Sequence, residues 1–355
     1  MTGKVGLSDL SPERSLWDDF IGNNAAIGFL RASLDRGRVA HAYLFTGPDH
    51  VGKRTLALTF AAALLCAAPW KAGRPCGRCK ACLQITKHTH PDVRLVEPEP
   101  GRRGVTIEQV RQLEHAAGLR PYQMDRKVLI LTNVEAMPEA AANALLKTLE
   151  EPPDDTILLL TASDISQVLP TIASRCREVA LRPVPAADIE AALAARGVEA
   201  ERAVLLARLA GGRPGWALTA LDEPAWLENR TEQIERLERL LARPRVGRLP
   251  EAAAFGDASS AKAALEVWLG WWRDALLVQQ GCGDLVTNVD RIEALRRLGA
   301  CHPPHVLWRA LARVQEARQQ LDANVNVRLA VEALLLDLPE STVATLNRSR
   351  VTEGE

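Results

Sequence analysis

The first half of the chain alternates short apolar runs with stretches whose apolar residues recur at helical spacing. This alternation predicts a parallel α/β sheet in which a helix follows each strand. The apolar runs predict strands at residues 42–46, 92–96, 128–132, 156–161 and 177–181. One of the helices is predicted to begin at Thr106, because Thr106-Ile107-Glu108-Gln109 has the spacing of a capping box.

After Pro183 the strand pattern disappears and only helical periodicity remains. A first group of helices is predicted at residues 189–196, 202–209 and 216–221. A second group is predicted at residues 228–242, 261–280, 289–298, 306–321 and 327–338. Pro244, Pro250 and Gly256 are plausible joints, and the tail from Pro339 is polar enough to fray.

Tryptophans are concentrated in the second group of helices. Trp268, Trp271 and Trp272 share one helical face with Leu265 and Leu276. Such a face is typical both of a domain core and of the centre of a subunit interface. The pattern favours the two interpretations equally.

The composition is that of an ordinary globular protein of 355 residues, 47% of them hydrophobic. Its 44 basic and 44 acidic side chains give a formal net charge of zero, which excludes a global field that would attract nucleic acid or an anionic membrane. The first residues are polar and the chain has no apolar run of about eighteen residues, so we expect a cytoplasmic protein without a membrane span. Seven cysteines, an odd number, favour a metal site or plain burial over a disulfide framework.

Residues 47–53, Gly-Pro-Asp-His-Val-Gly-Lys, follow a predicted strand and open a helix. They have the G-x-x-x-x-G-K spacing of a phosphate loop, in which backbone N–H groups surround phosphate oxygens and the lysine reaches the terminal phosphates. The candidate nucleotide-binding residues are therefore Gly47, Gly52, Lys53 and Thr55.

Several side chains that a nucleotide hydrolase requires are replaced. Arg54 stands where a Ser or Thr hydroxyl normally binds Mg²⁺, and Thr55 is turned away by about 100° on the same helix. The strand at residues 128–132 runs into Thr132-Asn133, where an acidic pair is expected. We therefore predict no ATP hydrolysis, and either a relic loop that caps a helix or weak, nonproductive nucleotide binding.

A cluster of cysteines follows the phosphate-loop helix. Cys76, Cys79 and Cys82 are separated by two-residue gaps, and Cys66 lies ten positions earlier. Four thiolates can form a closed tetrahedral zinc site that stabilises a loop too small to have its own core. The sequence therefore predicts a structural zinc, whereas reduced thiols without metal are the less favoured alternative.

Other potential ligands and thiols are scattered. His88 and His90 are fallback fourth ligands, although His90 before Pro91 fits a loop residue that enters the second strand. Cys176, Cys282 and Cys301 are predicted to be small buried hydrophobes.

Two longer tracts resemble the sliding-clamp-loader branch of the AAA+ ATPases. They are NALLKTLEEPP at residues 143–153 and LPTIASRC at residues 169–176. Residues 17–22, 41–45 and 324–326, together with the four cysteines, extend the resemblance over the whole chain. The motor subunits of that family share the cysteines and the Ser-Arg-Cys element, but have an intact phosphate loop and an Asp-Glu strand end.

The resemblance implies three domains. They are a RecA-like α/β domain with a zinc knuckle at residues 66–82, a three-helix lid and an all-α collar that builds a five-membered ring. We place these domains at residues 1–183, 184–245 and 246–345, which leaves residues 346–355 as a frayed tail.

The resemblance also implies roles for single residues. Arg175 and Ser174 match the Ser-Arg-Cys element, whose arginine reaches across an interface to the γ-phosphate bound by a neighbour. Gly215 falls where the motor subunits have an ATP-contacting arginine. A guanidinium is permanently charged and planar, which suits a phosphate oxygen in the transition state. Without that resemblance, Arg175 is a surface residue at a loop-to-helix junction, and Arg177 is predicted to be exposed at a strand start.

The preferred interpretation is a non-hydrolysing subunit of the bacterial DNA polymerase III clamp loader. Its partners would be the gamma/tau motor subunits and the delta subunit, with the sliding clamp and primer-template DNA as possible contacts and no membrane. One alternative is an active clamp-loader ATPase of the gamma/tau kind. Another is a zinc-knuckle nucleic-acid-binding module, for which Trp70 is the only nearby aromatic residue.

Overall fold

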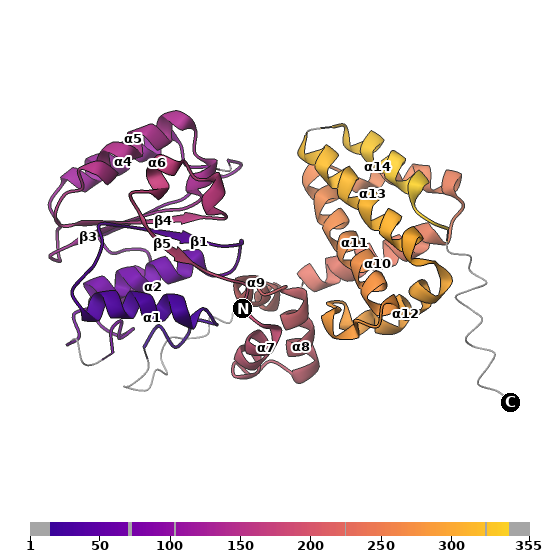
Figure 1. The fold of residues 1–355 in the computed structure, drawn as a ribbon, viewed down its shortest axis with the longest axis horizontal. Helices are drawn as coiled ribbons and strands as arrows, with labels where there is room; N and C mark the ends of the chain where they lie inside the picture. The colour runs from indigo at the N-terminus through magenta and orange to yellow at the C-terminus, as the bar shows by residue number, and fades with distance from the viewer. Residues whose placement is uncertain (1–14, 70–72, 103, 224, 324, 341–355) are drawn as a thin grey trace. The chain divides into compact units, whose positions relative to one another are not determined.

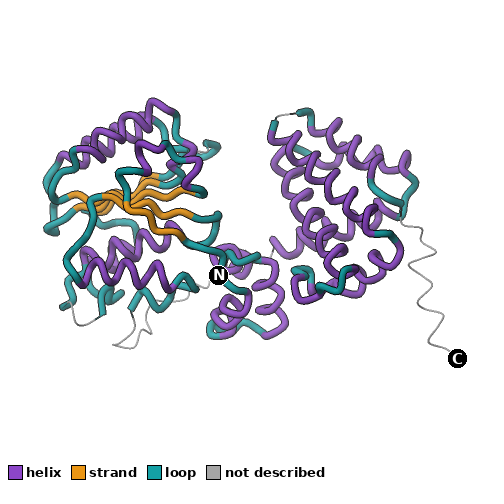
Figure 2. The backbone as a smooth tube through the Cα atoms, viewed as in Figure 1, coloured by secondary structure: helices purple, strands orange, loops and turns teal. Residues whose placement is uncertain are grey.

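The computed structural model describes residues 15–69, 73–102, 104–223, 225–323 and 325–340. The chain forms two compact units. The first unit runs to residue 196 and includes residues 212–216, and the second contains residues 197–211 and the chain from residue 217 onward. Strands among the described residues lie only in the first unit (Figure 2). No described helix is both long and apolar enough to cross a lipid bilayer.

The first unit is built on a five-stranded sheet of order β2-β3-β4-β1-β5, in which every pairing is parallel. Its strands are β1 (Ala42–Thr46), β2 (Val93–Val96), β3 (Lys127–Leu131), β4 (Thr156–Ala162) and β5 (Arg177–Ala180). Each predicted strand is confirmed, with ends that differ by at most one residue. The central strands are buried throughout, which explains why they read as continuous apolar runs.

Helices cover both faces of this sheet (Figure 1). They are α1 (Asn24–Asp35), α2 (Lys53–Leu65), α3 (Lys80–Thr86), α4 (Ile107–Gly118), α5 (Glu139–Glu150), α6 (Pro170–Ala173) and α7 (Ala186–Ala194). Alternate residues of β1 enter the two cores, Tyr43 and Phe45 on the side of α1 and α2, and Leu44 on the side of α4 and α5. The capping box at the start of α4 is confirmed, because Thr106 and Gln109 each accept a hydrogen bond from the other's backbone N–H.

The second unit is helical. Its helices are α8 (Ala200–Leu209), α10 (Ala225–Leu241), α11 (Ala258–Gln279), α12 (Ile292–Cys301), α13 (Pro304–Asp322) and α14 (Val327–Asp337). The boundary between the units passes through α9 (Pro214–Asp222), inside the segment predicted as a lid. The helices are thus confirmed, whereas the division into lid and collar stays a prediction, and the predicted tail at residues 346–355 lies outside the described residues.

The predicted joints adopt regular structure in part. Pro244 precedes a 3₁₀ helix, η5 (Arg245–Phe255), and Pro250 lies inside it. Gly256 ends this helix with φ of 69°, immediately before α11. A left-handed backbone of this kind is readily adopted only by glycine, so Gly256 marks the turn that the sequence predicts.

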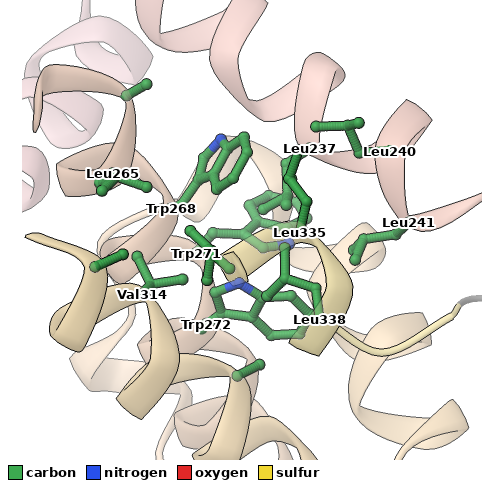
Figure 3. Packing of buried hydrophobic residues seen from close by; sticks show 14 of the residues in the cluster. Leu237, Leu240, Leu241, Leu265, Trp268, Trp271, Trp272, Val314, Leu335 and Leu338 are labelled. Atoms are coloured by element: carbon green, nitrogen blue, oxygen red, sulfur yellow. The ribbon is translucent and has the colours of Figure 1, made fainter. Parts of the chain in front are cut away.

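The tryptophan face of α11 forms the core of the second unit. Trp268, Trp271 and Trp272 are at most 1% exposed and pack against leucines of other helices, among them Leu237 and Leu335 (Figure 3). The indole N–H of Trp268 donates to the carbonyl of Gln233 at 3.0 Å. Of the two interpretations of this face, the structure supports the domain core.

A buried arginine joins two helix ends in the second unit. Arg248 is fully buried and donates to the carbonyls of Arg243 at 3.0 Å, Leu338 at 2.9 Å and Pro339 at 3.0 Å. The last carbonyls of a helix lack partners within the helix. Arg248 therefore satisfies carbonyls that follow α10 and α14.

We expect Arg248→Met to destabilise the second unit strongly. Each buried carbonyl left without a donor costs on the order of 1–3 kcal/mol, so the free energy of unfolding should fall by about 3 kcal/mol or more. Urea denaturation followed by tryptophan fluorescence measures this, because the tryptophan core lies in the same unit. The control is Arg239→Met: Arg239 is 61% exposed in an ion pair with Glu235, and its loss should change stability by about 0.5 kcal/mol or less. Equal effects of the two substitutions would contradict the role given to Arg248.

Candidate functional site

The predicted phosphate loop lies between β1 and α2. Gly47 and Gly52 have φ of 140° and 109°. A Cβ on Gly47 would lie 2.3 Å from the carbonyl oxygen of Leu181, and one on Gly52 would lie 2.7 Å from the ring of Phe20. Both positions therefore require glycine for steric as well as conformational reasons.

The loop lysine turns back onto its own loop. Lys53 is 8% exposed, and its ammonium donates to the carbonyls of Gly47 at 2.6 Å and Pro48 at 3.0 Å. It also forms an ion pair with Asp49 at 3.3 Å. The cation that would meet a terminal phosphate thus already has three acceptors, one of them a carboxylate.

The positions that would hold Mg²⁺ carry other chemistry. Arg54 binds Glu97 through two hydrogen bonds, from Nε at 2.8 Å and from Nη2 at 3.2 Å. Thr55 is exposed on α2, and Thr132 is buried after β3. Asn133 has a left-handed backbone, and its N–H donates to the hydroxyl of Thr161 at 3.3 Å. None of these four positions supplies a carboxylate.

The nearest acid, Glu135, has a structural partner. It lies in the 3₁₀ helix η3 (Val134–Ala136), beyond the end of β3, as the sequence predicts. Its Oε1 accepts from the N–H of Ser163 at 2.9 Å. Glu135 therefore joins the loop after β3 to the loop after β4.

The start of α9 contacts the phosphate loop. The N–H of Gly215 donates to the carbonyl of His50 at 2.9 Å. A Cβ on Gly215 would lie 2.8 Å from that oxygen, so the backbone here leaves no room for a larger residue. This is the position at which the resemblance expects an arginine.

The four predicted metal ligands converge. Cys66 ends α2, Cys79 is the N-cap of α3, and Cys76 and Cys82 lie on either side of Cys79. Their sulfur atoms all lie within 4.8 Å of one another, and Cys66 and Cys79 are 3.9 Å apart. A tetrahedral zinc with Zn–S bonds of about 2.3 Å places its sulfurs about 3.8 Å apart. The donor set therefore fits zinc.

Proton sharing within the cluster is consistent with a metal site. A hydrogen bond from Cys82 lowers the pKa of the Cys66 thiol, and the same contact raises the pKa of Cys82. Backbone N–H groups also point at sulfur, from Cys79 to Cys76 and from Cys82 to Cys79, each at 3.4 Å. These bonds favour thiolate, the form that binds metal.

The loop that carries the cysteines is joined to the N-terminal segment. The indole N–H of Trp17 donates to the carbonyl of Arg74 at 2.7 Å, and the hydroxyl of Ser15 donates to that of Pro75 at 3.1 Å. The sequence analysis did not find this support. A buried tryptophan before the first helix was the available signal.

Two predictions about the remaining residues have different outcomes. His88 and His90 lie outside the sulfur cluster, and His90 precedes β2, where its Nδ1 accepts from the N–H of Asp92 at 3.1 Å. Cys176 and Cys301 are only half-buried, and burial raises the pKa of Cys176 to about 12. The prediction of burial is wrong for Cys282, which is exposed because it lies in the turn after α11.

Arg175 follows the short helix α6. Its Nη1 donates to the carbonyl of Thr171 at 2.9 Å and to the hydroxyl of Ser174 at 3.4 Å. Its Nη2 forms an ion pair with Glu150 at 2.7 Å, and its side chain is 36% exposed. The structure thus brings together the two tracts that carry the resemblance, through one residue at the end of α5 and one after α6.

Comparison with known proteins gives consistent matches. The family model described as DNA polymerase III, delta subunit, matches residues 22–185, and the model of its C-terminal part matches residues 224–340. The chain is 30% identical to the DNA polymerase III subunit delta' of Bacillus subtilis over 315 residues, which are 87% of this chain and 93% of that protein.

Two further relatives match over shorter stretches. The subunit delta' of Pseudomonas aeruginosa is 43% identical over 208 residues, 58% of this chain and 63% of that protein. The subunit gamma/tau of Mycobacterium tuberculosis is 34% identical over 211 residues, 58% of this chain and 36% of that protein. The chain is thus similar to two kinds of DNA polymerase III subunit, and the long match is to delta'.

Proposed function

The chain belongs to the family of DNA polymerase III delta' subunits, and we propose that it is a clamp-loader subunit that does not hydrolyse ATP itself. The observation that carries this proposal is the phosphate loop, in which Lys53 is bound by Asp49 and by two loop carbonyls. Phosphoryl transfer depends on a positioned Mg²⁺ and on cations that neutralise developing charge.

The Mg²⁺ positions support the same proposal. Arg54 is paired with Glu97, and Thr132 and Asn133 end the strand that would carry an acidic ligand. This arrangement argues against the alternative of an active motor subunit, although the match to a gamma/tau protein covers the same domain. We propose that Gly47, Gly52, Lys53 and Thr55 form a degenerate site with weak nucleotide binding or none.

We propose that Arg175 acts on ATP bound by a neighbouring subunit, with Ser174 beside it. The guanidinium is partly exposed, and its flexible stem is held by Thr171 and Glu150. A γ-phosphate is a stronger partner for a planar fork than one exposed carboxylate. In an assembled ring the phosphate would therefore compete with Glu150 for the same guanidinium.

The remaining parts would serve assembly. We propose that the four cysteines hold a structural zinc, and that residues 184–245 and 246–345 act as lid and as oligomerising collar of a five-membered ring. The partners would be gamma/tau and delta subunits, with the sliding clamp and primer-template DNA contacted within the complex. As part of the replication machinery, the chain would act in the cytoplasm.

The substitution Lys53→Ala tests whether the loop is catalytic. We expect a clamp loader reconstituted with this variant to load clamps and hydrolyse ATP at nearly the unmodified rate, because Lys53 already bonds its own loop. The matched control is the corresponding lysine-to-alanine change in a motor subunit, which should abolish hydrolysis at that subunit's site. If both changes reduce ATPase equally, the loop of this chain is a working site.

A further inference from the structure

We propose that the first unit carries a phosphate-binding pocket on the side of the sheet that faces α1, separate from the degenerate phosphate loop. The pocket has a volume of about 420 Å³ and lies where the end of α1, the start of β1 and the start of β5 meet. Its wall is apolar and aromatic, and its cationic groups come from two segments far apart in the sequence. The lining includes Phe29, Val39, Tyr43, Arg36, Arg38 and Arg177.

The three arginines of the pocket have no acidic partner. Among the described residues, Arg36, Arg38 and Arg177 form no ion pair and no side-chain hydrogen bond, and no acidic residue lines the pocket. Glu178, next to Arg177, accepts instead from the hydroxyl of Thr46 at 2.8 Å. Three like charges at one pocket repel one another, so an anion that enters would relieve this repulsion.

The pocket is held by the fold rather than by loose side chains. Arg177 begins β5 and is paired in register with Tyr43 of β1. Its guanidinium lies 5.3 Å above the ring of Phe29 on α1. Stacking of this kind leaves the N–H edge of the guanidinium available for an acceptor.

The turn after α1 places the other two arginines. Arg36 caps α1, and Gly37, with φ of 62°, reverses the chain before Arg38. The hydroxyl of Tyr43 accepts from the N–H of Ala40 at 3.0 Å and fixes the end of this turn. Both arginines are therefore carried on backbone of defined geometry.

The chemistry of the pocket favours a phosphate. Guanidinium forks bind phosphate oxygens bidentately, and several forks suit a group with three or four oxygens better than a single carboxylate. The aromatic wall can contact a sugar or a base beside the phosphate. The phosphate could belong to a free nucleotide or to the backbone of DNA. The pocket uses neither Arg175 nor the cysteines, so the inference stands apart from the proposed function.

The test measures binding of phosphate-bearing probes to the full chain. The probes are a fluorescent oligo-dT of about 20 nucleotides, and ATP and inorganic pyrophosphate without Mg²⁺. We expect Arg38→Gln/Arg177→Gln to weaken binding of at least one probe about tenfold and to lower the salt dependence of oligonucleotide binding by about 0.7 per lost contact. The control Arg111→Gln/Arg120→Gln removes the same charge from two exposed arginines outside the pocket and should change binding less than about twofold.

The probes distinguish the two sources of phosphate. A loss confined to oligo-dT supports a DNA backbone, whereas a loss of ATP or pyrophosphate that persists in the Lys53→Ala chain supports a free nucleotide. Equal weakening by the two double substitutions would overturn the proposal. So would a lowered melting temperature without any change in binding, which would mean that the arginines only complement the carbonyl end of α1. Tighter binding of a polyglutamate peptide than of every phosphate probe would also overturn it.

Discussion

Arg175→Ala should sharply reduce ATP hydrolysis by a reconstituted clamp loader while leaving this chain folded and the ring assembled. An arginine that completes a neighbour's site is worth on the order of 10³ or more in rate at that site. Its contacts within the chain are a surface ion pair and two hydrogen bonds, which contribute little to stability. The total rate should fall by the share of the site it serves, or further if the sites fire in order.

Two further variants make this result specific. Arg175→Lys should not restore hydrolysis, because an ammonium lacks the planar fork. Glu150→Gln keeps the size of the side chain but removes the charge that holds Arg175, and should leave hydrolysis within a few-fold of the unmodified rate. A complex with Arg175→Ala that hydrolyses ATP and loads clamps normally would leave Arg175 as a surface residue.

Protein purified without chelator should contain about one zinc per chain, and loss of a ligand should remove it. Zinc binding contributes on the order of 10 kcal/mol to the folding of small zinc-finger peptides. The cysteine loop and α3 have few other contacts of that strength, so Cys82→Ser should release the metal and unfold this region. Metal analysis and hydrogen exchange of residues 66–86 measure the two effects.

Matched variants identify the ligands. Cys66→Ser should also lose zinc and change the spectrum of the cobalt-substituted protein, because Cys66 lies 3.9 Å from Cys79. Cys282→Ser replaces an exposed thiol outside the cluster and should keep full zinc and the same spectrum. Full zinc and an unchanged cobalt spectrum in Cys66→Ser would remove Cys66 from the ligand set.

The sheet could be predicted because its signals are local. Strands buried on both faces read as apolar runs, and the start of α4 has a complete capping box within four residues. The cysteine cluster was predictable for the same reason, since three of its ligands lie within one short loop and Cys66 ends the preceding helix.

The features that were not predicted depend on contacts between distant segments. Glu150 meets Arg175 across 25 positions, and Trp17 meets Arg74 across 57. The pairing of Lys53 with Asp49 is local, but the G-x-x-x-x-G-K pattern has no term for an acid inside the loop. The arginine pocket joins α1 to β5, which are neighbours only through the strand order of the sheet.

The rate of ATP hydrolysis, measured with Mg²⁺ for the purified full chain alone and for motor subunits with and without it, tests the central claim most directly. A non-hydrolysing subunit that supplies Arg175 predicts no hydrolysis by the chain alone and a rise when the chain, but not its Arg175→Ala form, joins the motor subunits. Hydrolysis by the chain alone that Lys53→Ala abolishes would contradict it.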